Sequence, residues 1–393
     1  MAVTRRSCPI CGERHADWLH TQRFEAVEGL SLLSGYDIVA CESCGCVFAD
    51  GIPDESAFAR YYGEQSKYEH AYRGGAEHAE ETERLRLLAD WIAAQIPSDA
   101  SLIDMGCGTG RLLAWLRERG FLSAGGLDPS STCVENARLL SKCPVIHSAI
   151  RERPPEYPPV DAVVLSAVLE HVPDVASTIR MVATWLKKDG ALFLEVPDAG
   201  HFALVQNAPY QEFSVEHINF FSGAALENLM HVHGFDVVTI DRTTAPVGPG
   251  CSGRVVRAHA IKSEGKTGAR LENESRSGVV AYLKACTELA IHEEAVLQRI
   301  ADTREPIYIW GVGTLCQRLL STGKLARVSI RGFIDSSSHH EGKTVAGLPI
   351  LPPRSLPDDG APLLITSWQF EDEIRRQITD LRQSPRTIHS LRR

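Results

Sequence analysis

Residues 101–110 read S-L-I-D-M-G-C-G-T-G and decide the fold of the chain. A short apolar run ends in Asp104, and three glycines then come at alternate positions: Gly106, Gly108 and Gly110. A helical pattern of leucines follows at once, so the stretch predicts a strand, a glycine turn and a helix. Glycine permits a tight turn and lets a ligand lie against bare main chain, and the helix N-terminus offers free N–H groups. The stretch therefore predicts a ligand site at the end of a strand.

A second acid supports that prediction. Residues 125–128, G-G-L-D, end another predicted strand at Asp128, about twenty residues further on, where a carboxylate can accept both hydroxyls of a ribose. The spacing D-x-G-x-G-x-G differs from the G-x-G-x-x-G of dinucleotide folds. The pair resembles the first two motifs of class I S-adenosylmethionine (SAM) methyltransferases. The resemblance implies that SAM is the cofactor, that Asp104 and the glycine turn lie under its methionine and adenosine parts, and that Asp128 holds its ribose. The alternative is a plain glycine-rich turn.

Length and composition limit the classes of protein that need to be considered. A chain of 393 residues is long enough for two or three domains. Its 44% hydrophobic and 23% charged residues are typical of an ordinary soluble protein. The formal charge is −9 and no long Lys/Arg run occurs, which argues against nucleic acid as the main partner. We see no secretory signal and no apolar stretch of membrane-spanning length, so we expect a cytoplasmic protein without a membrane partner.

The cysteines are concentrated near the N-terminus. Five of the eleven lie in the first 46 residues, and four of these form two C-x-x-C pairs: Cys8 with Cys11, and Cys41 with Cys44. Two such pairs can place four thiolates around one tetrahedral Zn²⁺, and four thiolates leave no open position for chemistry. The sequence therefore predicts a structural, zinc-ribbon-like module over residues 1–60, with Cys46 and His15 as reserve ligands. The alternatives are a redox pair or free buried thiols.

The segment after these cysteines, residues 53–75, is aromatic and ends in the hinge-like Arg73-Gly74-Gly75. Its aromatic residues are Phe58, Tyr61, Tyr62, Tyr68 and Tyr72. They either pack under the zinc module or form part of a lid over a polar substrate. Residues 77–96 then predict an amphipathic helix that is stopped by Pro97.

Strand and helix patterns alternate over residues 75–262, which predicts an α/β domain with a parallel sheet and helices on both faces. The strands are predicted at residues 101–104, 123–128, 144–147, 161–167, 191–196, 235–241 and 254–261. Together they would form a seven-stranded, Rossmann-like sheet of the class I methyltransferase kind. Glu170 and His171 follow the fourth strand at the carboxyl edge, where ligands bind in such sheets. They are candidates for the wall of the cofactor site, and capping of the next helix is the alternative.

The insertion after the fifth strand carries Glu216 and His217. We expect this loop to cross the top of the sheet, so the Glu-His pair can face the methyl donor. An unperturbed histidine has a pKa near about 6.5, which suits a base at neutral pH. If the methyl acceptor is a carbon next to a ketone, the hypothesis is that His217 removes its proton while Glu216 orients the imidazole. If a hydroxyl is methylated instead, His217 would deprotonate an alcohol.

A second strand–glycine-turn–helix unit begins at residue 306. It follows a polar linker over residues 263–276 and a predicted long helix over residues 278–301. Further strands are predicted at residues 328–335 and 363–366, and a helix at residues 370–381. Residues 278–393 therefore predict a small Rossmann-like domain. Its G-x-G lacks the third glycine of the dinucleotide motif, because Cys316 stands in that place.

The order of these modules resembles the sugar C-methyltransferases that act on nucleotide-linked 4-keto-deoxysugars. The resemblance covers essentially the whole chain. It implies that the C-terminal domain helps to hold a nucleotide-sugar in a cleft facing the SAM domain, and that His217 is the base. The chain departs from the family pattern at Ser214, where a tyrosine is usual, and after the C-terminal glycine turn, where Thr314-Leu315-Cys316-Gln317 stands in place of a segment with lysine. An O-methyltransferase and a SAM-binding scaffold protein remain the alternatives.

Overall fold

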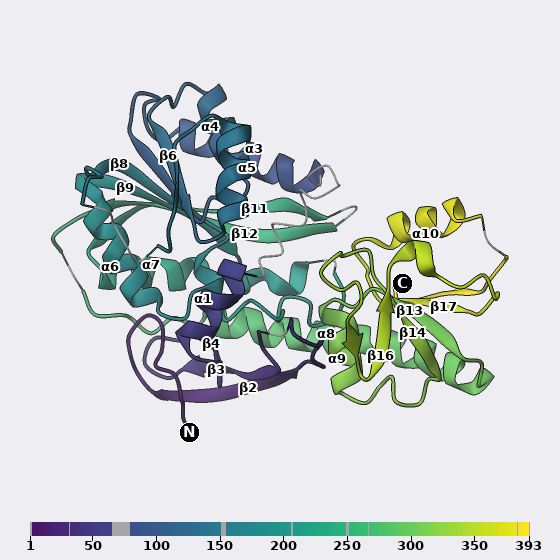
Figure 1. Cartoon of the computed structure of the whole chain (residues 1–393). Helices are drawn as coiled ribbons and strands as arrows, with labels where there is room; N and C mark the ends of the chain where they lie inside the picture. Colours follow the sequence, from purple (N-terminus) through teal and green to yellow (C-terminus); the bar gives the residue numbers. More distant parts are fainter. Residues whose placement is uncertain are drawn as a thin grey trace.

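The computed structural model describes residues 2–30, 32–64, 79–150, 155–205, 207–248, 251–265, 267–382 and 384–392. Three sheets organise these residues (Figure 1). In the view of Figure 1 the seven-stranded sheet lies at the upper left, a five-stranded sheet lies beneath it, and a six-stranded sheet lies on the right. Among the described residues, no helix combines the length and the apolar character needed to cross a membrane.

The seven-stranded sheet has the order β11-β12-β9-β8-β5-β6-β7. Its strands are β5 (Leu102–Met105), β6 (Ala124–Asp128), β7 (Val145–His147), β8 (Val160–Ser166), β9 (Leu186–Pro197), β11 (Phe235–Gly248) and β12 (Cys251–Lys262). Strands β9, β8, β5, β6 and β7 are parallel neighbours, whereas β12 is antiparallel to both β9 and β11. All seven predicted strands are confirmed, and β9, β11 and β12 run longer than predicted. The order reverses beside β5, and in open α/β sheets ligands bind at the carboxyl ends of the strands at such a point.

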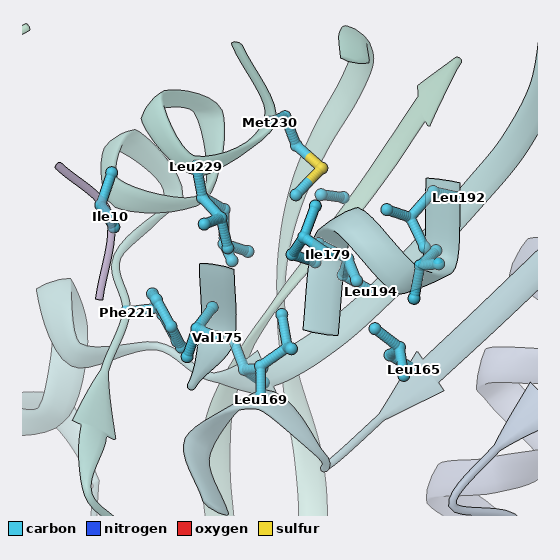
Figure 2. Packing of buried hydrophobic residues seen from close by; sticks show 14 of the residues in the cluster. Ile10, Leu165, Leu169, Val175, Ile179, Leu192, Leu194, Phe221, Leu229 and Met230 are labelled. Atoms are coloured by element: carbon cyan, nitrogen blue, oxygen red, sulfur yellow. The ribbon is translucent and has the colours of Figure 1, made fainter. Parts of the chain in front are cut away.

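Helices cover both faces of this sheet, as predicted. They are α3 (Ala79–Ala93), α4 (Arg111–Glu118), α5 (Ser131–Ser141), α6 (Val175–Trp185) and α7 (Gly223–Val232). Apolar side chains of α3, α4 and α5 pack in one cluster with strand residues, and those of α6 and α7 pack in another. Figure 2 shows the second cluster, in which Ile10 of the N-terminal module lies beside Leu229 of α7. The core of the α/β domain therefore continues into the module that carries the cysteine pairs.

A strand from the α/β domain completes the N-terminal sheet. That sheet consists of β1 (Ala2–Val3), β2 (His15–Arg23), β3 (Gly35–Cys41), β4 (Val47–Asp50) and β10 (Asn219–Phe220), in this order. Strand β10 belongs to the insertion after β9 and pairs antiparallel with β4. It begins two residues after His217, so the cysteine module and the predicted catalytic loop share one hydrogen-bonded ladder. Helix α1 (Glu55–Glu64) follows β4 along the chain.

Helix α8 (Glu274–Thr303) joins the two α/β units (Figure 1). Its first half crosses the 3₁₀ helix η2 (Ala199–Leu204) so closely that a Cβ on Gly278 would lie 2.3 Å from the carbonyl oxygen of Ala199. Only glycine fits at that crossing. Its second half contributes Val296 and Leu297 to the core of the C-terminal sheet.

The C-terminal unit is the predicted small Rossmann-like sheet, in the order β15-β16-β14-β13-β17-β18. Its elements are β13 (Ile307–Trp310), α9 (Thr314–Ser321), β14 (Ile330–Ile334), β15 (Thr344–Val345), β16 (Leu348–Leu351), η3 (Pro353–Ser355), β17 (Leu363–Ile365), α10 (Glu371–Asp380) and β18 (Ile388–Ser390). The loop between β2 and β3 docks on this unit. The N–H of Glu25 donates to the Gln317 carbonyl, and Val27 is buried in the C-terminal core. The long spacing between the cysteine pairs thus accommodates a contact with the C-terminal unit.

Candidate active site

The glycine turn and Asp128 are joined by main-chain hydrogen bonds. The N–H of Gly108 donates to Asp128 Oδ2, and the N–H of Ser130 donates to Asp128 Oδ1, each at 2.9 Å. Ser130 is fully buried and its Oγ caps α5 by accepting the N–H of Cys133. The turn that follows β5 is thereby fixed to the end of β6. Ser130 was not among the predicted site residues, although a serine before a helical pattern is a recognisable N-cap signal.

The three glycines of the turn have different surroundings. All three adopt a positive φ, with values of 81° at Gly106, 51° at Gly108 and 81° at Gly110. A Cβ on Gly106 would lie 2.8 Å from Val168, and one on Gly110 would lie 2.8 Å from the main chain of Ala137. A Cβ on Gly108 would have no heavy atom within 4 Å. Gly106 and Gly110 are thus required for packing, whereas Gly108 borders open space in which a ligand can lie against main chain.

Asp104 is buried at the end of β5, with 3% of its surface exposed. Burial, and secondly the nearby carboxylate of Asp128, raise the pKa of Asp104 to about 7. A carboxyl group in this state is about half ionised at neutral pH. The positive charge of a bound cation would favour the ionised form. The predicted cofactor residues Asp104, Gly106, Gly108, Gly110 and Asp128 therefore lie together at the carboxyl edge of the sheet.

A second group of side chains lies next to this turn. The 3₁₀ helix η1 (Leu169–His171) follows Val168, which contacts Gly106 as described above. Side-chain ligand atoms of Glu170, His171 and His217 all lie within 4.8 Å of one another. The imidazole Nε2 of His171 is 4.0 Å from Glu170 Oε1, and the His171 and His217 rings meet edge to face with centroids 4.9 Å apart. Glu170 and His171 are buried, and His217 is partly exposed.

Main-chain contacts fix this arrangement. His171 Nδ1 lies 3.2 Å from the Glu216 carbonyl oxygen. A carbonyl oxygen only accepts hydrogen bonds, so Nδ1 must carry a proton to bond to it. In a neutral His171, Nε2 is then the unprotonated nitrogen, and it is this nitrogen that lies beside Glu170. The N–H of Ile218 donates to the Glu170 carbonyl at 2.8 Å. The loop of His217 and the helix η1 are thus held together on both sides of the imidazole pair.

Two tyrosines of α1 join the group. The Tyr61 hydroxyl donates to Glu216 Oε1 at 2.6 Å, and the Tyr62 ring meets the His171 ring with centroids 5.9 Å apart. The sequence predicted that the aromatic segment either packs under the zinc module or forms part of a lid. Of these two rings, Tyr61 contacts the predicted catalytic residue Glu216, and Tyr62 contacts His171, predicted for the cofactor wall. The predicted hinge at residues 73–75, together with Tyr68 and Tyr72, lies outside the described residues.

Ser214 has a structural role in the same loop. Its Oγ accepts the N–H groups of Glu216 and His217, at 3.3 and 3.1 Å, and so closes the turn that presents the histidine. The main-chain oxygen of Ser214 accepts the hydroxyl of Tyr36 at 2.8 Å. A serine therefore shapes this turn at the position where the sugar C-methyltransferases usually have a tyrosine. The tyrosines near this loop, Tyr61 and Tyr62, belong to α1.

A buried charge network that the sequence did not reveal joins β9, α3 and β12. Glu195 of β9 forms ion pairs with Arg84 of α3 and, at 2.7 Å, with Arg257 of β12. Arg84 also donates to the Ser166 hydroxyl at 3.3 Å, at the end of β8. Because removal of one member would leave buried charge without compensation, this network holds α3 against the sheet. An arginine in an amphipathic helix gives no sequence signal that it points inward.

The cysteine pairs come together as predicted. The sulfur atoms of Cys8 and Cys44 are 3.5 Å apart, as are those of Cys11 and Cys41, and all four lie within 4.8 Å of one another. Four thiolates on one zinc ion at about 2.3 Å would be about 3.8 Å apart, so the donor set fits tetrahedral zinc. The reserve ligands do not join this set. Cys46 Sγ is directed at the Val47 carbonyl, and the His15 ring bonds to Glu13.

Comparison with known proteins agrees with this geometry. Residues 76–240 match a family model described as a methyltransferase domain. The chain is 25% identical to the C-methyltransferase NovU of Streptomyces niveus, over 93% of this chain and 90% of that protein. It is 32% identical to a ubiquinone biosynthesis O-methyltransferase of Stutzerimonas stutzeri (strain A1501), over 30% of this chain and 56% of that protein.

Among solved structures, part of the chain is similar to the magnesium protoporphyrin IX methyltransferase of Synechocystis PCC 6803, solved with bound SAM. That structure matches 54% of this chain and 99% of its own, with 16% identity and a TM-score of 0.40. The family match, the strand order and the glycine turn assign a class I SAM-dependent methyltransferase domain to this chain. The protein is accordingly a SAM-dependent methyltransferase.

Proposed function

We propose that the protein transfers the methyl group of SAM to a carbon of a nucleotide-linked keto-deoxysugar. The proposal is supported by the similarity to NovU, a C-methyltransferase, which extends over nearly the whole chain. The observation that carries it is the group formed by Glu170, His171 and His217, because methylation of a carbon next to a ketone requires a base at the reacting carbon. These residues adjoin the cofactor turn through Val168.

The base in this proposal is His217, whose partly exposed imidazole can reach a substrate. Bound SAM supplies an electrophilic methyl group on a sulfonium that is its own leaving group, so the protein need only position the reactants and free the nucleophile. His217 removes the proton next to the ketone, which leaves an enolate. The proton stays on the imidazole during the methylation step.

Glu170 then has a different role from the cofactor wall suggested by its place in the sequence. Protonation of His217 creates a cation beside the buried His171 ring. The carboxylate of Glu170, within 4.8 Å of both imidazoles, compensates that charge. Glu216, which accepts the hydroxyl of Tyr61, fixes the loop and holds His171 through its carbonyl oxygen.

The N-terminal cysteines are proposed to hold one structural Zn²⁺. Cys8, Cys11, Cys41 and Cys44 would be its ligands, and the close approach of their sulfur atoms supports this assignment. A zinc ion with four thiolates has no open position, so its contribution is to the folding of the module.

Substitution of His217 by asparagine tests the base. We expect His217→Asn to lower turnover by about 100-fold or more, with SAM affinity within about twofold of wild type, because the loss of a general base removes 10²-fold to 10⁴-fold. The control is His231→Asn, which changes the same residue type in the last turn of α7. Turnover of His217→Asn within a few-fold of wild type would remove the base assignment.

Hydroxyl methylation on the same scaffold is the second candidate, and the similarity of part of the chain to an O-methyltransferase favours it. Release of S-adenosylhomocysteine should be measured with matched nucleotide-sugars that do or do not carry a 4-keto group. Release only with the keto sugars, together with exchange of the adjacent proton in D₂O, supports carbon methylation. Release with the hydroxy sugars supports the second candidate, and release with none of them contradicts both.

A further inference from the structure

Arg6 links the cysteine module to both loops of the candidate active site. Its Nη1 donates to the carbonyl oxygens of Ile218 and Ala49, at 3.1 and 3.3 Å. Its Nη2 donates to the carbonyl oxygen of Pro173 at 2.8 Å and to Asn219 Oδ1 at 2.6 Å. One guanidinium group therefore bonds the residue after His217 and a residue two positions after His171.

Asn219 extends the same connection. It is buried, and its Nδ2 donates to the carbonyl oxygens of Leu169 and Val172, at 2.7 and 2.8 Å. These two carbonyls flank Glu170 and His171 in the chain. The side chain of Asn219 thus fixes η1 relative to β10, and Arg6 donates to the oxygen of the same amide.

The position of Arg6 depends on the cysteine module. Arg6 precedes Cys8 by two residues, and its main-chain N–H donates to Asp50 Oδ1 at 2.8 Å, at the end of β4. Its guanidinium lies over the ring of Phe48, 5.7 Å from the centroid. Phe48 is in turn the β-ladder partner of Asn219. The knuckle that contains Cys8 and the strand that carries Asp50 therefore determine where the guanidinium points.

We infer that Arg6 is a positioning residue, through which a folded cysteine module sets the geometry of His171 and His217. The catalytic meaning of this inference rests on the proposed function of His217, but the positioning itself does not. A planar guanidinium with several donors suits this role, because it can bond four acceptors in fixed directions, which an ammonium group cannot. The cofactor turn is built separately from β5, β6 and α4, so it should keep its affinity when Arg6 is changed.

Hydrogen exchange of the two loops tests the positioning directly. In Arg6→Gln we expect peptides covering residues 168–173 and 214–222 to exchange about tenfold faster or more, because the variant loses hydrogen bonds from a charged donor. The control is Arg5→Gln, an equal change of charge at the neighbouring exposed residue, in which both peptides should exchange as in wild type. Unchanged exchange in Arg6→Gln, with zinc content and overall fold retained, would overturn the inference.

Two further measurements keep the test decisive. Arg6→Lys retains the charge and serves if Arg6→Gln does not fold; it should show an intermediate rate of exchange, and a wild-type rate would contradict the role of the guanidinium. Removal of zinc from wild type with a chelator should accelerate exchange of the same two peptides, and should add little in Arg6→Gln. Equal acceleration by the chelator in both proteins would show that the cysteine module acts by another route.

Measurement of kcat and of the Kd for SAM distinguishes failure of this inference from failure of the proposed function. With an accepted nucleotide-sugar, Arg6→Gln should lower kcat by about tenfold while the Kd for SAM stays within about twofold of wild type. A parallel loss of SAM affinity would overturn the inference, because it would indicate general damage to the fold. If no sugar is methylated by wild type, the proposed function fails, whereas the exchange data still decide whether Arg6 positions the loops.

Discussion

The chain contains two glycine turns that are anchored in the same way. In the methyltransferase domain, Asp128 at the end of β6 accepts the N–H groups of Gly108 and Ser130. In the C-terminal unit, Asp335 after β14 accepts the N–H of Val312 at 2.7 Å and that of Ser337 at 2.8 Å. In both units one carboxylate ties the turn after the first strand to the loop after the second. The shared device is structural, since it holds the main chain whether or not a ligand is present.

The two turns differ in the residue that precedes the first glycine and in the residue at the third glycine position. Ile309, fully buried, stands two residues before the first glycine of the C-terminal turn, where the methyltransferase domain has Asp104. Leu315, packed in the C-terminal core, stands in the place of Gly110. Asp335 also pairs with the imidazole of His340, and this pairing together with main-chain hydrogen bonds outweighs burial and lowers its pKa. Of the two turns, the first alone has an acid two residues before its first glycine, and we therefore propose that SAM binds there and not at the second turn.

Removal of the anchoring acids gives the largest expected contrast. Asp128→Ala should weaken SAM binding by about 100-fold or more, which is about 2.7 kcal/mol, because it removes the proposed ribose acceptor and releases Gly108. Asp335→Ala should leave the Kd for SAM within about twofold of wild type. Titration calorimetry with both variants measures the contrast. Equal losses of affinity would mean that the two turns do not differ in the way we describe.

The third glycine gives an effect of similar size, on stability rather than on SAM affinity. Gly110→Ala places a Cβ 2.8 Å from the main chain of Ala137 at a φ of 81°, so we expect a loss of about 3 kcal/mol in the free energy of unfolding. Gly323, which follows α9, has a φ of 72° and open space around its Cβ position. Gly323→Ala should therefore lose only about 1 kcal/mol, from strain in the main chain. Thermal unfolding of both variants checks this, and equal losses would refute the packing role of Gly110.

The sequence predicted the methyltransferase sheet well because its signals are local. Each strand there is a short apolar run that ends in a turn residue, and Asp104, the glycines and Asp128 follow from spacing alone. The N-terminal sheet was predicted only in part. The two residues of β10 carry no strand signal of their own, and their pairing with β4 depends on residues more than 150 positions apart. Contacts of that kind are set by tertiary packing.

The candidate active site shows the same limit. His217, Glu216, Glu170 and His171 were singled out from their places after strands, but the sequence assigned Glu170 and His171 to the cofactor wall. The structure brings Glu170 and His171 together with His217, because the N–H of Ile218 donates to the Glu170 carbonyl and the His171 imidazole bonds to the Glu216 carbonyl. That Glu170 and His171 also line the cofactor site stays a prediction. Tyr61 and Arg6 are brought in from distant segments, and nothing in the pattern around either residue indicates the contact.

The middle glycine provides a smaller and cleaner comparison. Gly108 and Gly313 both border open space, with no heavy atom within 4 Å of either Cβ position. Gly108→Ala should weaken SAM binding by about tenfold, because the added methyl group occupies space next to exposed main chain and strains a φ of 51°. Gly313 has an extended conformation with a negative φ, so Gly313→Ala should change neither stability nor SAM affinity. A similar Kd in both variants would argue against a ligand above the first turn.

The ionisation of Asp104 gives the smallest effect and the most specific one. Its pKa in the free protein is about 7, above the ordinary value of 3.8, so the folded state binds the proton more tightly than the unfolded state. The carboxyl therefore favours folding below its ordinary pKa, and this contribution is lost as pH rises through about 7. SAM carries positive charge, so its binding should favour the ionised form.

If only the ionised form binds SAM, the Kd should be about threefold lower near pH 7.5 than near pH 6.5. Asp104→Asn cannot ionise, so it should bind SAM weakly at both pH values and should unfold at a higher temperature than wild type above pH 7 in the absence of SAM. Asp335→Asn is the matched control, because the pKa of Asp335 is already low and its carboxylate is ionised throughout this range. If the SAM affinity of wild type is the same at both pH values, Asp104 does not take part in binding as a carboxylate. The first turn would then differ from the second only in its glycines.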